Sequence, residues 1–350
     1  MKIAAAKLQA FCTDVLRVAG INDDDAHTTA EILVLTDTWG VFTHGTKNLR
    51  GYVRRIQSGG IRGNAQPKIV SEGPAWAIVD ADSGLGMVGS TFAMRAAIAK
   101  AETAGIAYAG VRNSCHFGAA GCYAAMAAEK NMIGLAMAND TPTMTVPGAR
   151  GLVLGNNPFA CAIPTGEPPP ILLDIAMSVV AGGKVFAAAT KGEKIPETWM
   201  VDSTGKPTTD PTLFPHAGAL LPMAGHKGYG LALMIETLSA VLTGTSIASH
   251  VLSWSFADPS RATGHGAAFI AIDVNAVMPL EQFAQRMRQT IQEIRSAPKI
   301  EGEQIYLPGE KEWRRRESAL REGIEMPDDV LASLRSLAGE MGIDFGSLTR

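Results

Sequence analysis

Cysteines and aromatic residues are scarce in this sequence. There are 4 cysteines among 350 residues, and aromatic residues make up 6%. The cysteines (Cys12, Cys115, Cys122 and Cys161) form no short CxxC pair, so the spacing does not predict a zinc site. A secretory leader is also missing from the pattern, and we therefore expect reduced thiols.

Long hydrophobic runs are absent as well. No stretch of about 18 uninterrupted apolar residues occurs, so we expect no membrane span. In the first segment, Leu8, Phe11 and Val15 recur at helical spacing, which predicts an amphipathic helix and not a signal peptide. These features favour a cytoplasmic protein.

Neither sign of charge is in large excess. The sequence has 31 Lys and Arg against 34 Asp and Glu, a net charge of -3. The densest basic run, 311–316, is broken by Glu312 and Trp313, which is typical of a solvated helix face. A nucleic-acid partner is not expected, because it needs a clustered basic face. Neither a Walker loop nor a GxSxG elbow is present, and no metal site is predicted.

Strand and helix patterns alternate through the chain, which predicts an α/β fold. The expected strands are 76–80, 107–111, 132–138, 160–164, 171–175 and 269–274. The expected helices are 91–104, 119–129, 229–242, 280–295 and 328–341. Segment 191–215 is rich in proline and glycine and is expected to be a long surface excursion, either beside a site or simply an ornamented loop.

A glycine motif, GLGMVG at 84–89, follows a strand pattern and precedes a helix, as a dinucleotide-binding fingerprint would. Three features count against that interpretation. The unit does not head a repeated βαβ array, and the next strand is followed by Arg112 instead of an acidic residue. In addition, Asp80 and Asp82 crowd the turn with negative charge. We therefore favour a glycine-rich turn and helix start.

Two histidines stand in polar, glycine-flanked turns. His44 precedes a basic segment, and His116 directly follows an expected strand. Loops at the carboxyl ends of strands commonly carry chemistry, and histidine is the usual proton donor when a carbonyl is reduced. The alternative for each is a structural imidazole. The other five histidines (His27, His216, His226, His250 and His265) are weaker candidates.

Lys227 and Asp174 are candidates for contacts to a ligand. Lys227 lies where an apolar helix is expected to start, and a cation there opposes the helix dipole, which favours an anion or cofactor contact over a solvated lysine. Asp174 ends a short apolar segment, where it could bind a cofactor hydroxyl.

Nearly the whole chain resembles one family, the type 2 malate/L-lactate dehydrogenases. The family includes ureidoglycolate and sulfolactate dehydrogenases and cyclic-imine carboxylate reductases. The similar segments are GVFTHGTKNL (40–49), DADSGLGMVGS (80–90), VRNSCHFGAAGCYA (111–124), LGNNPFACAIP (154–164), LLDIAMSVVAGGK (172–184), IPETWMVDSTGKPTTDP (195–211), GALLPMAGHKGYGLALMIE (218–236), TGHGAAFIAID (263–273) and YLPGEKE (306–312).

The resemblance implies a non-Rossmann α/β fold that binds NAD or NADP, in a homodimer with cofactor and substrate near the subunit interface. We expect residues 1–70 plus 275–350 to form a mostly helical dimerisation and substrate domain, and residues 71–274 the α/β cofactor-binding and catalytic domain. His116 matches the family's proton donor and acceptor, and His44 its second site histidine. The implied cofactor contacts are Asp140, Thr141, Asp174, Ile175, Ala176, Lys227, His265, Pro308, Gly309 and Glu310.

Two positions depart from the family pattern. Thr43 stands where the family usually has serine, and it keeps the hydroxyl. Asn48 stands where the family usually has the arginine that grips the substrate carboxylate, and an amide cannot replace that charge. Either Lys47 or Arg50 substitutes, or the carboxylate is held differently, or the substrate is not a plain 2-oxo acid. We count Thr43, Lys47 and Asn48 as substrate-binding candidates.

Three functions follow as hypotheses. The first is an NAD(P)H-dependent oxidoreductase that interconverts a small 2-oxo acid and its 2-hydroxy acid, resembling malate, lactate and sulfolactate dehydrogenases. The second is a ketimine reductase that acts on cyclic imine carboxylates such as piperideine- or pyrroline-2-carboxylate. The remote third is a non-catalytic nucleotide-binding protein, against which the retained His44, His116 and Lys227 argue.

Overall fold

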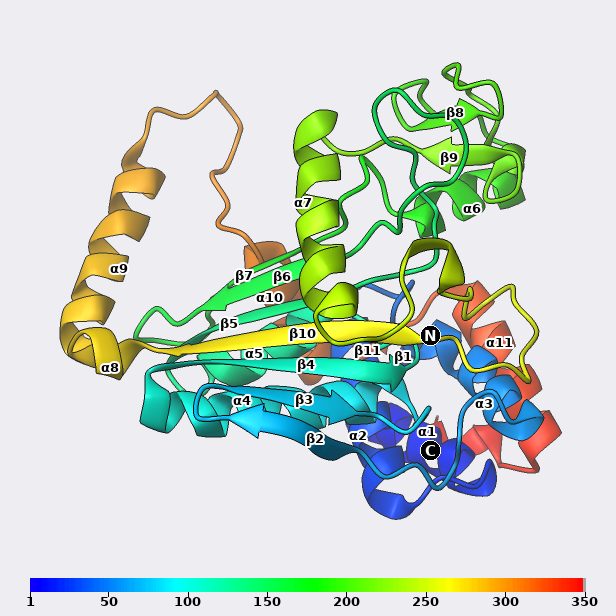
Figure 1. Ribbon diagram of the computed structural model, residues 1–350, viewed down its shortest axis with the longest axis horizontal. Coiled ribbons are helices and arrows are strands. Elements are labelled where there is room, and N and C mark those ends of the chain that lie inside the picture. Colours follow the sequence, from blue (N-terminus) through cyan, green and yellow to red (C-terminus); the bar gives the residue numbers. More distant parts are fainter. Residues whose placement is uncertain (349–350) are drawn as a thin grey trace.

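A seven-stranded sheet forms the centre of the computed structural model, which describes residues 1–348 (Figure 1). Its strand order is β2-β3-β4-β10-β5-β6-β7. The strands are β2 (Lys68–Gly73), β3 (Trp76–Asp80), β4 (Ile106–Ser114), β5 (Met132–Ala138), β6 (Phe159–Ile163), β7 (Ile171–Ile175) and β10 (His265–Asp273). Only β3 and β4 pair in parallel; the other neighbours are antiparallel.

Two small sheets and eleven α-helices accompany this sheet in the described chain. The two-stranded sheets pair β1 (Lys2–Ile3) with β11 (Ile324–Glu325), and β8 (Met200–Asp202) with β9 (Gly218–Leu220). The helices are α1 (Ala5–Val18), α2 (Asp23–Thr38), α3 (Leu49–Ser58), α4 (Gly86–Ala104), α5 (Ala120–Ala128), α6 (Gly182–Lys191), α7 (His226–Glu236), α8 (Val274–Val277), α9 (Leu280–Ser296), α10 (Glu310–Glu322) and α11 (Asp328–Met341). None of these described helices is long and apolar enough to cross a membrane.

The two faces of the sheet belong to two separate cores. Along β10, Phe269 and Ala271 pack in the larger core with α1, α2, α4 and α5, whereas Ala268 packs in the smaller core with α7. This alternation follows from the two-residue period of a strand. Helices α4 and α5 therefore cover one face of the sheet and α7 covers the other (Figure 1).

Strand register brings several predicted site residues to one edge of the sheet. His265 pairs with Ser114, so the start of β10 lies beside the end of β4. Ala267 pairs with Ala138, which brings the end of β5 to the same edge. Through β6, Phe159 pairs with Ile175 and adds the end of β7. His116, Asp140, His265 and Asp174 thus come together from distant parts of the sequence.

Several element boundaries differ from the sequence prediction, and for three of these differences the packing gives a reason. Strand β10 begins at His265, four residues before the expected start. The expected helix 229–242 is α7 followed by a π-helical turn, Thr237–Val241. That turn lies against β10, because a Cβ on Gly266 would sit 2.1 Å from the Ser239 carbonyl oxygen. The start of β10, at Gly266 to Ala268, consists of small residues with little strand propensity, but the close packing here requires them.

The third difference is the glycine motif at 84–89, where α4 begins at Gly86, inside the motif. A Cβ on Gly86 would lie 2.3 Å from the Cys115 carbonyl oxygen, and one on Gly89 would lie 2.8 Å from the Ala81 Cβ. Arg112 pairs with Asp80 at 3.1 Å. The glycines therefore let α4 pack closely against the loops of the sheet, in agreement with a glycine-rich helix start.

Candidate active site

Two cavities meet at the edge of the sheet. The first cavity, of about 580 Å³, is bordered by the residues after β4, the end of β7 and the turn at Pro308 and Gly309. The second cavity, of about 980 Å³, is bordered by α6, by the end of segment 191–215 and by the loop around Trp254. Thr43, His44, His116, Asp140 and Asn156 line both. The junction thus holds the two histidines that the sequence singled out.

His116 is held from two sides at this junction. The Tyr52 hydroxyl lies 2.6 Å from its Nδ1, and the Gly118 backbone N–H donates to the same atom at 3.4 Å. The indole of Trp254 stacks on the imidazole with ring centroids 4.6 Å apart. The direction of the Tyr52 contact depends on the tautomer: when Nδ1 carries the proton and donates to the Tyr52 oxygen, the lone pair of the neutral ring is on Nε2.

Burial sets the protonation of His116. Desolvation, together with the neighbouring His44, lowers the pKa of His116 to about 3, while Asp140 opposes the shift. The imidazole is therefore neutral near pH 7 when the cavities hold no charged ligand. A neutral imidazole has a lone pair, so it can accept a proton from a substrate hydroxyl.

His44 stands beside His116, with ring centroids 5.7 Å apart. Its Nδ1 lies 2.9 Å from the Thr43 hydroxyl, and burial lowers its pKa. The turn that carries it is fixed by the buried Asp37, which accepts hydrogen bonds from the Thr46 N–H at 3.1 Å and the Thr46 hydroxyl at 2.5 Å. The pair presents two imidazoles from two different segments to one space.

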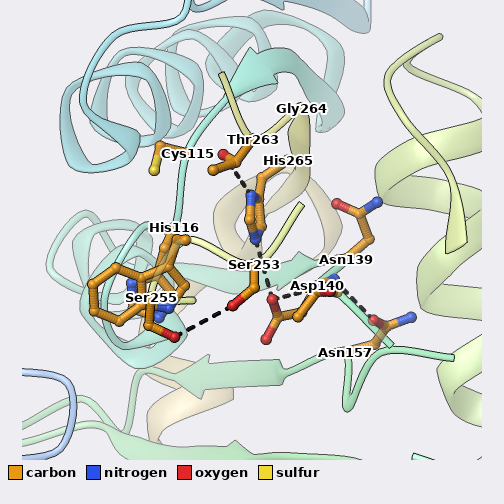
Figure 2. A network of polar contacts seen from close by, with 12 residues as sticks. Cys115, His116, Asn139, Asp140, Asn157, Ser253, Ser255, Thr263, Gly264 and His265 are labelled. Carbon is orange, nitrogen blue, oxygen red and sulfur yellow. Dashed lines mark hydrogen bonds and ion pairs between the residues drawn. The ribbon is translucent and has the colours of Figure 1, made fainter. Parts of the chain in front are cut away.

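A polar chain runs behind the junction. Figure 2 shows the His265 ring between Thr263 and Asp140, with distances of 2.8 Å to the Thr263 hydroxyl and 3.1 Å to the Asp140 carboxylate. The backbone of Asp140 is held as well, because its N–H donates to Oδ1 of Asn157 at 3.1 Å. The contact with His265 lowers the pKa of Asp140 despite burial, so Asp140 stays a carboxylate close to His116.

The first cavity gathers most of the predicted cofactor contacts. Its lining includes Asp140, Asp174, Ile175, Ala176, His265, Pro308 and Gly309. The turn at Pro308 is tied to β7, because the Leu172 N–H donates to the Pro308 carbonyl at 3.1 Å. Asp174 accepts from the Gly121 N–H at 2.8 Å, and burial raises its pKa to about 6.

Three of the proposed cofactor contacts lie elsewhere. Thr141 lines only the second cavity. Glu310 does not line the first cavity; its carboxylate pairs with Arg314 at 2.5 Å. Lys227 is exposed at the start of α7 and lines neither cavity of the described chain. The helix start around it is nevertheless irregular, with Ala224 and Gly225 at positive φ.

The three substrate candidates, Thr43, Lys47 and Asn48, all line the second cavity. The one cation among them, Lys47, is paired with an acid. Thr43 lies at the junction of the cavities. The Asn48 amide donates to the Thr43 carbonyl at 2.9 Å, and Lys47 pairs with Asp329 at 2.7 Å. Arg50 pairs with Glu340 at 2.5 Å and does not line the cavity. Of the two basic residues near Asn48, Lys47 lines the cavity and Arg50 does not.

Sequence reasoning missed Tyr52, Trp254 and Arg55. Tyr52 and Trp254 touch His116 from α3 and from a loop about 200 residues away, and no local pattern joins those segments. Arg55 is 1% exposed and donates to the backbone carbonyls of Ser253, Trp254, Ala257 and Arg261. Its only signal was its place in a basic segment, which reads as a solvated helix face.

Comparison with known proteins identifies the family. The malate/L-lactate dehydrogenase family model matches residues 3–335. A malate dehydrogenase from Pyrococcus horikoshii is 38% identical over 98% of this chain and 96% of its own. An L-sulfolactate dehydrogenase from Methanocaldococcus jannaschii is 37% identical, with coverage of 95% and 94%. A pyrroline- and piperideine-2-carboxylate reductase from Pseudomonas putida is 32% identical, with 97% of each chain covered.

Solved structures agree in fold. The structure of the M. jannaschii sulfolactate dehydrogenase superposes with a TM-score of 0.92 at 35% identity and covers 100% of both chains. The chain therefore is an α/β protein of the dehydrogenase class. It belongs to the malate/L-lactate dehydrogenase family, and the resemblance found in the sequence motifs is confirmed.

Proposed function

We propose that this protein is an NAD(P)H-dependent oxidoreductase that interconverts a 2-oxo acid and the corresponding 2-hydroxy acid. The observation that carries the proposal is the His44 and His116 pair at the junction of two cavities, one suited to a cofactor and the other to a small substrate. The relatives named as malate and sulfolactate dehydrogenases support the same reaction type.

The first cavity fits a nicotinamide nucleotide, either NAD or NADP. Small residues line it where α5 begins, and Ala119 caps that helix without a side-chain hydrogen bond. The buried Asp174 carboxyl offers a partner for a hydroxyl group. A largely antiparallel sheet, and a glycine motif used in helix packing, support a non-Rossmann binding mode.

The bound cofactor supplies the hydride chemistry at C2 of the substrate. In the oxidative direction, the neutral His116 accepts the proton of the substrate hydroxyl, and in the reductive direction the protonated ring returns it. His44 and the Thr43 hydroxyl orient the substrate and stabilise charge on its oxygen. Tyr52 and Trp254 fix the plane of the His116 ring.

The test is a spectrophotometric panel at 340 nm with NADH and with NADPH. The substrates are pyruvate, oxaloacetate, 2-oxoglutarate, sulfopyruvate and larger 2-oxo acids. We expect NADH or NADPH to be oxidised with at least one of them. A His116→Ala variant should still bind the cofactor but lose most turnover. If no substrate is turned over although a nucleotide binds, the non-catalytic alternative takes the place of this proposal.

A ketimine reductase is the second candidate. It is supported by the P. putida relative, named as a reductase of cyclic imine carboxylates, and by Asn48 at a position where the family pattern has arginine. Adding piperideine- and pyrroline-2-carboxylate to the panel separates the two functions. Turnover of the imines alone would assign amino-acid formation.

We further propose a cytoplasmic homodimer with two domains, residues 1–70 plus 275–350 and residues 71–274. Exposed apolar side chains on α7, among them Leu231 at 50% and Met234 at 54%, support a subunit contact on that face. Sedimentation equilibrium at micromolar concentration measures the mass directly. A monomer mass would contradict the dimer without touching the proposed chemistry.

A further inference from the structure

One wall of the second cavity is aromatic. The ring of Phe186 lies 5.0 Å from that of Phe214 and 5.5 Å from that of Phe256. His216 meets the Phe256 ring edge-on at 6.1 Å, and all four side chains line the cavity. Phe256 is 54% exposed, so it presents a large apolar surface to any molecule that enters.

The charges around the same cavity are nearly balanced. Lys47 pairs with Asp329 at 2.7 Å, and Asp140 is a second carboxylate on the lining. Among the described residues that line the cavity there is no arginine, and Lys191 is the remaining lysine. The cavity therefore has charge for one carboxylate but not for a second anionic group.

These two features select between kinds of 2-oxo acid. A substrate with an anionic end group would lose water around that group without gaining a cationic partner, which is unfavourable. A substrate with an apolar end group would instead cover the Phe256 ring and remove apolar surface from water. Both effects act in the same direction, toward a substrate with one charged and one apolar end.

We propose that the substrate is a 2-oxo monocarboxylic acid with an aryl or branched alkyl side chain, and that this side chain packs on the wall formed by Phe186, Phe214 and Phe256. The inference rests on the proposed function and narrows its substrate class. Phe256 becomes a specificity-determining residue, because it is the most exposed ring of the wall. Asn48 belongs to the same selection, since the arginine of the family pattern would add one cation to the lining of this cavity.

The first experiment compares kcat/KM for phenylpyruvate and 4-methyl-2-oxopentanoate with kcat/KM for oxaloacetate and sulfopyruvate. The wild-type protein is used with whichever nucleotide it oxidises. We expect the apolar substrates to be preferred by about tenfold or more, the size of effect that an apolar pocket achieves. Equal or higher kcat/KM for oxaloacetate or sulfopyruvate overturns the inference and leaves the oxidoreductase proposal intact.

Variants then locate the selection. Phe256→Ala should raise KM for phenylpyruvate about tenfold, with kcat and the kinetics of pyruvate little changed. Phe92→Ala removes a phenylalanine of similar exposure, 38%, from α4 outside the cavity, and it serves as the matched control. Asn48→Arg should raise kcat/KM for oxaloacetate relative to kcat/KM for phenylpyruvate. If Phe256→Ala lowers kcat/KM equally for pyruvate and phenylpyruvate, Phe256 does not select for the substrate side chain.

Binding separates the inference from the proposed function. Calorimetric titration of 3-phenyllactate and of malate into the protein with its reduced nucleotide forms a dead-end complex, so the measurement needs no turnover. Tighter binding of 3-phenyllactate supports the apolar wall even if no 2-oxo acid in the panel is reduced; tighter binding of malate overturns it. Sedimentation of Phe256→Ala is the last check, because dissociation of an oligomer would show that a subunit, and not the substrate, covers the wall.

Discussion

His116 combines a buried ring with a defined set of neighbours. Its Nδ1 is occupied by Tyr52 and the Gly118 N–H, and one face is covered by Trp254. Only the Nε2 side remains for a reacting group. Burial makes the neutral form dominant, so the free protein is prepared for the oxidative direction and has to take up a proton for reduction.

This asymmetry predicts a pH dependence that differs between the two directions. Since burial lowers the pKa of His116 to about 3, the protonated fraction above that value falls tenfold for each pH unit. We expect kcat/KM for reduction to fall by about tenfold per unit from about pH 6 to about pH 9, and kcat/KM for oxidation to stay nearly flat. Initial rates in both directions provide the measurement. A reduction profile that is flat across this range would mean that another group donates the proton.

The hydroxyl of Tyr52 can be tested without disturbing the packing. Tyr52→Phe keeps the ring that stacks on Trp254 but removes the 2.6 Å contact to His116. We expect kcat to fall by about tenfold with little change in KM, because the orientation of the ring matters most during proton transfer. Tyr108→Phe is the matched control: its hydroxyl donates to the Leu238 carbonyl in another part of the fold. Equal effects of the two substitutions would speak against orientation by Tyr52.

At the scale of elements, Arg55 connects α3 to the loop that carries Trp254. Its guanidinium is buried, and burial lowers its pKa, yet its donors are directed at four backbone carbonyls of residues 253–261 and not at a carboxylate. The fit is close, because a Cβ on Gly60 would lie 2.2 Å from the Pro259 carbonyl oxygen. The loop is thus held against α3, with Trp254 over His116 and Phe256 over the second cavity.

Removing this clamp should loosen the loop more than the fold. Arg55→Met leaves several carbonyls without donors, and we expect kcat/KM to fall by at least about tenfold. Acrylamide quenching of tryptophan fluorescence should rise, and because the chain has 5 tryptophans, the rise should disappear when Trp254→Phe is added. Arg54→Met, which alters an exposed neighbour on the same helix, is the control. If quenching is unchanged while the protein loses activity, the loop has not moved and Arg55 acts differently.

At the scale of the whole molecule, buried acids oppose stability as pH rises. Burial raises the pKa of Asp37 to about 7, against about 3.8 for an unperturbed carboxyl. Between these values the folded protein keeps a proton that the unfolded chain has released. The contribution of Asp37 to the free energy of unfolding therefore decreases with rising pH through this interval, by an amount on the order of 4 kcal/mol.

Asp37→Asn isolates this contribution from other titrating groups, among them His44 and His116, whose lowered pKa values act in the opposite sense. The amide oxygen still accepts from Thr46. We expect the variant to gain stability relative to wild type as pH rises from about 4 to about 7, with a constant difference above that. Urea unfolding at several pH values gives the two curves. Parallel curves would show that Asp37 is ionised in the folded protein.

The sequence by itself determined the α/β class, the family and the two histidines. Strands 76–80, 132–138 and 171–175 were predicted with their observed bounds, because apolar runs between turn residues are a local property of the chain. The ordered motifs around His44 and His116 identified the family, which the comparisons confirm.

Only the tertiary structure decided what surrounds those residues. The stacking of Trp254 on His116, the Arg55 clamp and the aromatic wall of the second cavity join segments that are distant in sequence. It also placed Lys227 outside the lining of both cavities and showed that Lys47 and Arg50 are paired with acids. The physical reason is that periodicity and turn chemistry act between near neighbours, whereas side-chain partners are set by which elements the sheet register brings together.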